Sequence, residues 1–562
     1  MDRQPPRATS DEIDLYIRTY YSLLRSSGDV RVRAFEEAHL YSRSSLHLGA
    51  EHATEPDLAA FAYSAGRLPD CMPRIRHIVL GQSLAQFEAA GYMVDRWQSV
   101  KTRGRRRPLR WDGGDTLAAF VASASDIDDL VPILTSYQIE WNKLRDRLVA
   151  AKISDVTDDE ALSAALGGAE AVLRLRGALG PRSNDILGDM TAHDCDLFLR
   201  LLDGSFREYQ RSAQRWWHAI APAVPPNRPV YFISSNSHSL ANLLGGYARR
   251  HREEIVAFLH RRNFEDLAPR YDEALAKGDQ SLATNILYYS LRAFIHEPGG
   301  DAINGRMQQV QESDASAGIR AIASPGKIDV DAQVIELSML HPDNLDPRVH
   351  VPGIERLNES PAVLINIDYP LGMAAYHHLT SVALGVEDLR GVYIMGKAAT
   401  LNGRVGDVMI SKVNHDEHSS NTYLFRNSLT AGDVQPFMRH GTVLDNQKAL
   451  TVRSAFLQNR EYMDVFYREG YTVMEMEAGP YLAAAYETAE PRRHPQNQLV
   501  SLVDQSSFEL GVIHYASDTP YSRRQSLLSK SMSYFGMEST YGCAIAIARR
   551  IFASELSRLD DH

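Results

Sequence analysis

The sequence predicts an α/β protein whose C-terminal part is built on a mixed, largely parallel sheet and is preceded by a mostly helical N-terminal region. Two patterns of apolar residues along the 562-residue sequence indicate this fold class. The first two hundred residues repeat apolar side chains at three- and four-residue steps, which is the period of a helix. From about residue 319, short runs that are apolar on both faces alternate with helical segments, as in parallel sheets covered by helices.

The N-terminal region shows the helical period in two segments, both expected to form core. Thr9 and Glu12 form a capping box that starts the first helix. The apolar face of this helix consists of Ile13, Tyr16, Ile17, Tyr20 and Leu24. The apolar face of the second consists of Ile127, Leu130, Leu134, Tyr137, Trp141 and Leu144. Between them, the basic segment 101–110 is typical of a solvated loop; the alternative is contact with a phosphate or an acidic partner.

A proline-rich joint at 221–229 ends the helical region, and a buried strand is predicted over 230–234. The polar turn at 235–239 then leads into an apolar-periodic helix. Backbone N–H groups and hydroxyls at such a turn bind anions, so Ser235 and Ser237 are candidate phosphate ligands. The alternative, which is the more common one for Ser and Asn at this position, is a plain helix N-cap.

A polar, glycine-rich segment at 296–318 predicts a linker. We therefore divide the chain into a mostly helical N-terminal domain (1–220), a strand–helix extension with a linker (221–318) and a last domain (319–562). In the last domain a helix is expected at 371–384, and strands are expected at 334–340, 362–367, 391–396, 407–413, 471–477 and 511–517. Ligands of such sheets bind at the carboxyl ends of the strands.

Three polar segments follow these predicted strands. Gly396 and Lys397 combine a close backbone approach with one positive charge. Glu475 and Glu477 are separated by one residue, so one carboxylate can meet a substrate while the other packs into a polar network. Asp518 leaves a buried strand, where desolvation raises the pKa of a carboxyl and lets it serve as an acid. Each segment alone is a weak signal, because acidic residues after strands are more often caps or turn formers.

Taken in order, these segments resemble the nucleoside phosphorylase superfamily, which includes purine nucleoside phosphorylases, methylthioadenosine nucleosidase and AMP nucleosidase. The resemblance covers roughly residues 320–560 and implies a three-layer α/β domain. It is carried by AVLINIDYPLGMAAYHHLTSVAL, by LRGVYIMGKAATLNGRVGDVMIS with its glycine turn, by the E-M-E-A motif in YTVMEMEAGPYLAAAYE, by the S-D-x-P motif in YASDTPYS and by the closing helix YGCAIAIARRIF.

The resemblance implies a role for each matching residue. Glu477 would accept hydrogen bonds from the ribose 2′ and 3′ hydroxyls, with Met476 against the sugar. Phe456 would stack on the nucleobase, the alternative being a core phenylalanine. Asp518 would give a proton or a hydrogen bond to the leaving base. The substrate-binding residues implied are Glu475, Met476, Glu477, Phe456, Gly396 and Lys397.

One departure from the family favours hydrolysis over phosphorolysis. The arginine and the hydroxyl with which the family's phosphorylases hold phosphate are replaced by Ile394 and Lys397. Lys397 is a single point charge without the planar fork of arginine. The S-D-x-P form and the long N-terminal region look most like AMP nucleosidase, so a nucleotide or nucleoside substrate is expected; for the activation of water, only Glu336 is suggested. The alternatives are a phosphorylase or ribosyl transferase, and a non-catalytic nucleotide sensor.

Composition limits the remaining function classes. The formal net charge of −11 disfavours non-specific nucleic-acid binding. The three cysteines lie far apart, and His415 and His418 stand in a polar segment, so no disulfide framework, metal or cofactor is expected. No apolar run reaches the length of a membrane span and no signal peptide is evident, so we expect a cytoplasmic protein without membrane contact. The resemblance implies a homo-oligomer.

Overall fold

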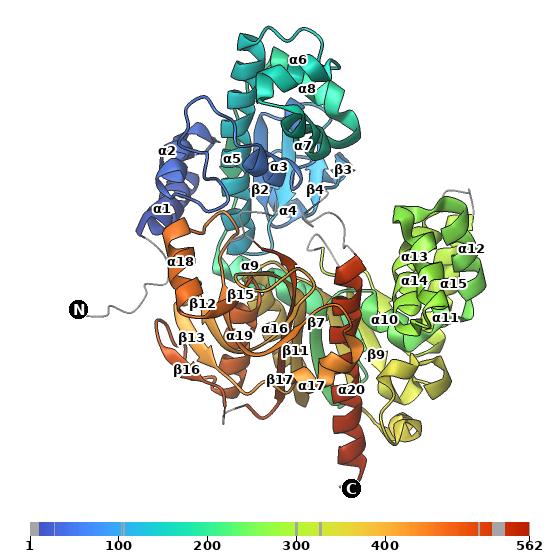
Figure 1. Ribbon diagram of the computed structural model, residues 1–562. Coiled ribbons are helices and arrows are strands. Elements are labelled where there is room, and N and C mark those ends of the chain that lie inside the picture. The colour runs from blue at the N-terminus through green and yellow to red at the C-terminus, as the bar shows by residue number, and fades with distance from the viewer. Residues whose placement is uncertain are drawn as a thin grey trace.

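The computed structural model describes residues 11–560 except 27, 103, 105–106, 298–301, 325–328, 504–505 and 520–533. The chain forms two sheets with helices around each (Figure 1). We call residues 11–205, around the smaller sheet, the N-terminal domain, and residues 206–560, around the larger sheet, the C-terminal domain. Within the described part of the chain, no helix is long and apolar enough to cross a lipid bilayer.

The N-terminal domain contains a six-stranded sheet of order β1-β6-β2-β5-β4-β3. Its strands are β1 (Val30–Arg31), β2 (His77–Gly81), β3 (Gln98–Val100), β4 (Leu109–Trp111), β5 (Thr116–Phe120) and β6 (Phe198–Leu201). Its helices are α1 (Asp11–Ser26), α2 (Arg33–Tyr41), α3 (Leu58–Ala65), α4 (Leu84–Ala89), α5 (Ala124–Ala150), α6 (Asp159–Leu166), α7 (Ala169–Leu179) and α8 (Ser183–Ala192). The expectation of helix after helix was therefore wrong in omitting a sheet, whose strands of two to five residues are too short to show a period.

The C-terminal domain is built on an eleven-stranded sheet. Its strands are β7 (Val230–Ser235), β8 (Ile319–Ile322), β9 (Ala332–Glu336), β10 (Val363–Asp368), β11 (Leu389–Thr400), β12 (Val408–Asp416), β13 (Asn421–Leu424), β14 (Val443–Thr451), β15 (Tyr471–Glu475), β16 (Leu499–Ser501) and β17 (Glu509–Asp518). Of the eleven pairings among described residues, six are parallel and five antiparallel. The sheet is mixed, as expected, but "largely parallel" overstates the parallel share.

Part of this sheet closes on itself. Strand β17 pairs with both β11 and β12, so that β11, β15, β14, β12 and β17 form a ring. Each strand of the ring contributes one buried apolar residue to a common cluster, namely Ala398, Met409, Ala449, Val473 and Ala516. Such a narrow barrel is filled by side chains, so ligands have room only at its ends.

Two domain boundaries differ from the expected ones. Strand β7, expected in a separate extension, lies in the middle of the large sheet between β10 and β11 and is parallel to both. Helix α9 (Phe206–Ile220), expected in the N-terminal domain, places Trp216 and Trp217 in the core of the large sheet. The segment 296–318 was expected to be a linker, yet its described part consists mostly of helix α15 (Ala302–Ser316).

Helices cover both faces of the large sheet. Along β7, Val230 and Phe232 pack on one face, while Tyr231 and Ile233 pack on the other. The first face is covered by α9, α16 (Ala374–Gly385) and α19 (Ala478–Ala489). The second is covered by α10 (Ser239–Gly245), α11 (Tyr247–Arg250), α12 (Arg252–Arg262), α14 (Gln280–Ile295) and α20 (Tyr534–Asp560). The remaining helices are α13 (Leu267–Ala276), α17 (Ala431–Val434) and α18 (Arg460–Arg468).

The two domains share a packed interface. Phe456 and Leu457, from the segment between β14 and α18, belong to the core of the N-terminal domain. The start of α5 is held by Asp128, which pairs with Arg453 of the C-terminal domain at 3.3 Å and accepts a 2.5 Å hydrogen bond from the Tyr20 hydroxyl. Figure 1 shows the N-terminal domain seated against the large sheet, with α1 and α2 beside α18.

Candidate active site

The candidate site lies at the ends of strands β15 and β17, which both pair with β11. On one side Ala399 of β11 pairs with Asp518, the last residue of β17, and on the other it pairs with Met474 of β15. Two strand spacings separate the backbones of Asp518 and Met474, which is about 10 Å. Glu477 follows Met474 by three residues and lies just beyond the end of β15, directly before α19.

Asp518 is half-buried at the end of β17. Desolvation raises the pKa of Asp518 above its ordinary value, while the Ser517 hydroxyl, which donates to Oδ2 at 2.9 Å, and the charges of Arg67 and Lys397 lower it. Desolvation also lowers the pKa of Lys397, against the charge of Asp518. A carboxyl with a raised pKa beside cations can hold a proton and still release it to a leaving group.

Glu477 is half-buried directly before helix α19. The backbone N–H of Gly372, in the loop between β10 and α16, donates to Glu477 Oε1 at 3.2 Å. A carboxylate offers acceptors only, so Glu477 suits a ligand with hydroxyl donors. Met476 lies beside it, partly buried against the cluster that contains Leu450 and Phe466.

Glu475 takes the structural role of the pair. It is 3% exposed and accepts hydrogen bonds from Asn414 Nδ2 at 3.1 Å, from the Thr451 hydroxyl, and from the backbone N–H groups of Glu477 and Ala478 at 2.7 and 2.6 Å. It therefore caps α19. Glu475 is thus the network-forming carboxylate of the expected pair. Its assignment to substrate binding was wrong, because its oxygens accept hydrogen bonds from groups of the protein itself.

Phe456 was expected to stack on a base, and that expectation was wrong. The side chain is 1% exposed and packs among Tyr63, His39 and His47 of the N-terminal domain, with ring centroids 5.2, 6.1 and 6.4 Å away. It is a core phenylalanine, the alternative that helical apolar spacing favours.

The serine turn after β7 forms hydrogen bonds within the protein. The Ser235 hydroxyl, 1% exposed, donates to Asn366 Oδ1 at 2.6 Å. The backbone N–H of Ser237 donates to Asp368 Oδ1 at 2.9 Å, so a carboxylate occupies the place expected for an anion. Asn236 accepts from the N–H groups of the next turn, as a helix cap does. The Ser235 hydroxyl is therefore not available to a phosphate, and the contacts of this turn are those of the helix N-cap that was the alternative; a phosphate role of Ser237 stays a prediction.

Gly396 lies on β11 opposite His514 of β17. A Cβ at Gly396 would stand 3.7 Å from both His514 and Tyr369, an ordinary contact distance, so steric crowding does not require glycine there. Glu336, suggested as the residue that activates water, forms a salt bridge with Arg320 at the end of β9.

Two residues of the N-terminal domain reach the site and were missed by sequence reasoning. Arg67, just after α3, acts electrostatically on Asp518, and its buried Nε has no hydrogen-bond partner among the described residues. Ser125, in the first turn of α5, contacts the loop that holds Glu477. Nothing local in the sequence marks either residue, because the contacts join segments hundreds of residues apart.

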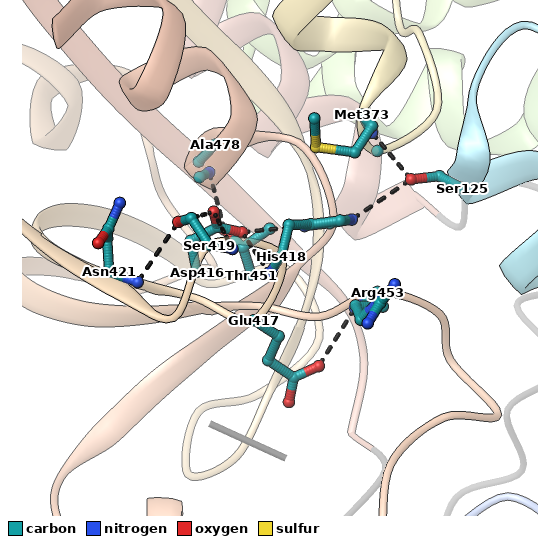
Figure 2. Close-up of polar contacts among 12 residues, drawn as sticks. Ser125, Met373, Asp416, Glu417, His418, Ser419, Asn421, Thr451, Arg453 and Ala478 are labelled. Atoms are coloured by element: carbon teal, nitrogen blue, oxygen red, sulfur yellow. Dashed lines mark hydrogen bonds and ion pairs between the residues drawn. The ribbon is translucent and has the colours of Figure 1, made fainter. Parts of the chain in front are cut away.

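Figure 2 shows His418 between Ser125 and Asp416. His418 Nδ1 lies 2.9 Å from Asp416 Oδ1, and Nε2 lies 3.3 Å from the Ser125 hydroxyl. His415, its neighbour in sequence, instead contacts the Thr422 hydroxyl at 2.9 Å. Among the residues that the structure describes, no group of three or more His, Cys, Asp or Glu side chains is arranged to hold a metal ion.

The fold and the site define a class of α/β protein in which a closed ring of strands carries two carboxylates at its rim. The chain belongs to a family of unknown function, DUF6909, whose profile matches residues 32–553. No curated protein compared with the chain matches it.

Several solved structures are similar to part of the chain. The 5′-methylthioadenosine/S-adenosylhomocysteine nucleosidase of Neisseria meningitidis, in complex with methylthio-immucillin-A, is 11% identical, covering 44% of this chain and 95% of that chain with a TM-score of 0.28. The corresponding nucleosidase of Colwellia psychrerythraea, in complex with adenine, is 10% identical, with coverages of 41% and 86% and a TM-score of 0.27. Uridine phosphorylase of Schistosoma mansoni, in complex with uracil, is 12% identical, with coverages of 32% and 68% and a TM-score of 0.25.

Proposed function

We propose that the protein cleaves the N-glycosidic bond of a nucleotide or nucleoside by hydrolysis. Asp518 acts as the general acid on the leaving base, and Glu477 accepts hydrogen bonds from the ribose hydroxyls. The observation that carries the proposal is that Ala399 of β11 pairs on one side with Asp518 and on the other with Met474, in the strand that ends just before Glu477.

The chemistry follows from the charges that develop as the bond breaks. The sugar becomes cationic at C1′, where water adds, and the base becomes anionic, so a proton supplied by a positioned acid neutralises the departing base. Desolvation, which raises the pKa of Asp518, supports its protonated form. The carboxylate of Glu477, held by Gly372, orients the sugar. We further propose a 5′-phosphorylated substrate such as AMP, because Arg67 and Lys397 place two positive charges near Asp518.

A second candidate is phosphorolysis, in which the same two cations hold inorganic phosphate as the attacking group. Incubation of the full chain with AMP and with unphosphorylated nucleosides in phosphate-free buffer separates the two reactions. Release of free base and ribose 5-phosphate without added phosphate supports hydrolysis. A strict requirement for phosphate would replace it by phosphorolysis, and no cleavage of any nucleotide or nucleoside in either buffer would refute both.

A further inference from the structure

We propose that Ser125 of the N-terminal domain is a positioning residue for Glu477, so that the N-terminal domain completes the ribose-binding part of the site. This inference rests on the proposed role of Glu477. Ser125 does not itself touch Glu477; it acts through the loop between β10 and α16, whose Gly372 N–H donates to the Glu477 carboxylate.

Residues at the start of α5 form hydrogen bonds with this loop at two positions, one on each side of Gly372. The backbone N–H of Met373 donates to the Ser125 hydroxyl at 2.8 Å. The Ser123 hydroxyl donates to the carbonyl of Leu371 at 3.4 Å. Gly372, between these two contacts, is the residue whose N–H reaches Glu477. The N-terminal domain is therefore linked to the carboxylate by hydrogen bonds to the two residues that flank Gly372 and by the hydrogen bond of Gly372 itself.

The loop and the start of α5 are in close contact at Gly372 and Ser125. Gly372 has φ of +51°, and a Cβ built on it would overlap the Ser125 hydroxyl oxygen and lie 2.6 Å from the Ser125 Cβ. Only glycine lets the loop backbone approach this closely in a left-handed conformation. A change in the place of the Ser125 hydroxyl is therefore transmitted to the loop rather than absorbed by free space.

A histidine and a buried aspartate fix the orientation of the Ser125 hydroxyl. Since this oxygen accepts from Met373, its own proton is free to be donated to His418 Nε2, 3.3 Å away. His418 Nδ1 then carries the proton that faces Asp416, at 2.9 Å. Asp416 is 1% exposed and also accepts from the N–H and the hydroxyl of Ser419, at 3.2 and 2.5 Å. In this series of hydrogen bonds, from Met373 through Ser125 and His418 to Asp416, every donor faces an acceptor (Figure 2).

Asp416 also borders the helix that follows Glu477. A Cβ on Gly479, in the first turn of α19, would lie 2.7 Å from the Asp416 side chain. Glu477 is thus flanked by the Gly372 loop on one side and by a helix packed on Asp416 on the other. The same Ser125–His418–Asp416 chain is connected to both supports, which favours a positioning role over incidental packing between domains.

The test compares Ser125→Ala with a matched control, Ser136→Ala, in the full chain. Ser136 lies on the same helix, is buried, and its hydroxyl has no hydrogen-bond partner among the described residues. Steady-state kinetics are measured with a ribonucleotide and with its 2′,3′-dideoxy analogue. We expect Ser125→Ala to lower kcat/KM about 10- to 100-fold on the ribonucleotide, and far less on the analogue, which has no hydroxyls for Glu477 to hold.

A double-mutant cycle adds a second readout. If Ser125 acts through Glu477, Ser125→Ala adds little further loss in a Glu477→Gln background. Equal losses on both substrates, additive losses in the cycle, or a loss no larger than that of Ser136→Ala would overturn the inference while leaving the proposed function intact. A wild-type chain that cleaves neither substrate would instead refute the proposed function. If Ser125→Ala does not fold, His418→Gln tests the same chain from its other end, with the same hydroxyl-dependent loss expected.

Discussion

Replacing Asp518 with asparagine removes the transferable proton of the proposed acid while keeping the shape of the side chain. The Ser517 hydroxyl, 2.9 Å from Oδ2, finds an acceptor of the same geometry in the asparagine amide oxygen. The variant therefore keeps its local packing and loses the acid alone. A positioned general acid contributes about 10²- to 10⁴-fold. We expect turnover to fall by that factor, which corresponds to about 2.7–5.4 kcal/mol of transition-state stabilisation.

Substrate binding by this variant should change little. The form of Asp518 that acts as an acid is the neutral one, which desolvation favours by raising its pKa, and asparagine is neutral as well. In this form of the enzyme, the charges of Arg67 and Lys397 face an uncharged side chain both before and after the substitution. We expect the Kd for substrate to stay within about tenfold, as for a group whose interaction matters mainly in the transition state.

Single-turnover release of the base measures the chemical step, and titration calorimetry measures binding. Ser517→Ala serves as the control, because it removes the hydrogen bond at Oδ2 and keeps the acid; its turnover should remain well above that of Asp518→Asn. Turnover of Asp518→Asn within threefold of wild type would refute the assignment of the acid. A loss confined to binding would show that Asp518 recognises the substrate without protonating it.

Three further predictions concern the surroundings of the two carboxylates. Glu477→Ala should weaken binding and turnover together, because the sugar loses its anchor in both states; an effect on turnover alone, by the same two assays, contradicts this. Arg67→Met should move the alkaline limb of the kcat/KM pH profile to higher pH, since Arg67 lowers the pKa of Asp518 and activity is lost as pH rises through that pKa; an unchanged or lowered limb argues against it. Gly372→Ala, at a φ of +51° and against the Ser125 side chain, should lower the free energy of unfolding by about 2–5 kcal/mol, from the left-handed backbone and the overlap together. Denaturant titration checks this, and a change below about 1 kcal/mol speaks against so close an approach of the loop to the helix.

The strands of the large sheet were predictable where they are apolar on both faces, as for β10, β11 and β17. Their pairing was not. Val230 lies beside Val363 in a parallel register, although 133 residues of sequence separate them. The local sequence therefore predicted the strand of residues 230–235 but placed it in a separate extension. A local pattern predicts that a strand exists; only tertiary contacts decide which strands are its neighbours.

The candidate site divides in the same way. The places of Asp518 and Glu477 at strand ends were predictable, because the sequence makes the burial of both strands plain; their roles stay predictions. Phe456 was misassigned because its position before the E-M-E-A motif does not reveal that it packs into the other domain. Arg67 and Ser125 carried no signal at all, since an arginine after a helix and a serine in a first turn have ordinary local explanations.

These two missed residues link the N-terminal domain to the two carboxylates of the proposed active site. Arg67 follows α3 and acts on Asp518, whereas Ser125 begins α5 and supports the loop that holds Glu477. Because they come from different elements of one packed core, a displacement of that domain changes the surroundings of both carboxylates together. A substrate that needs both carboxylates in place binds the docked arrangement more tightly, and by linkage its binding stabilises the docking of the two domains.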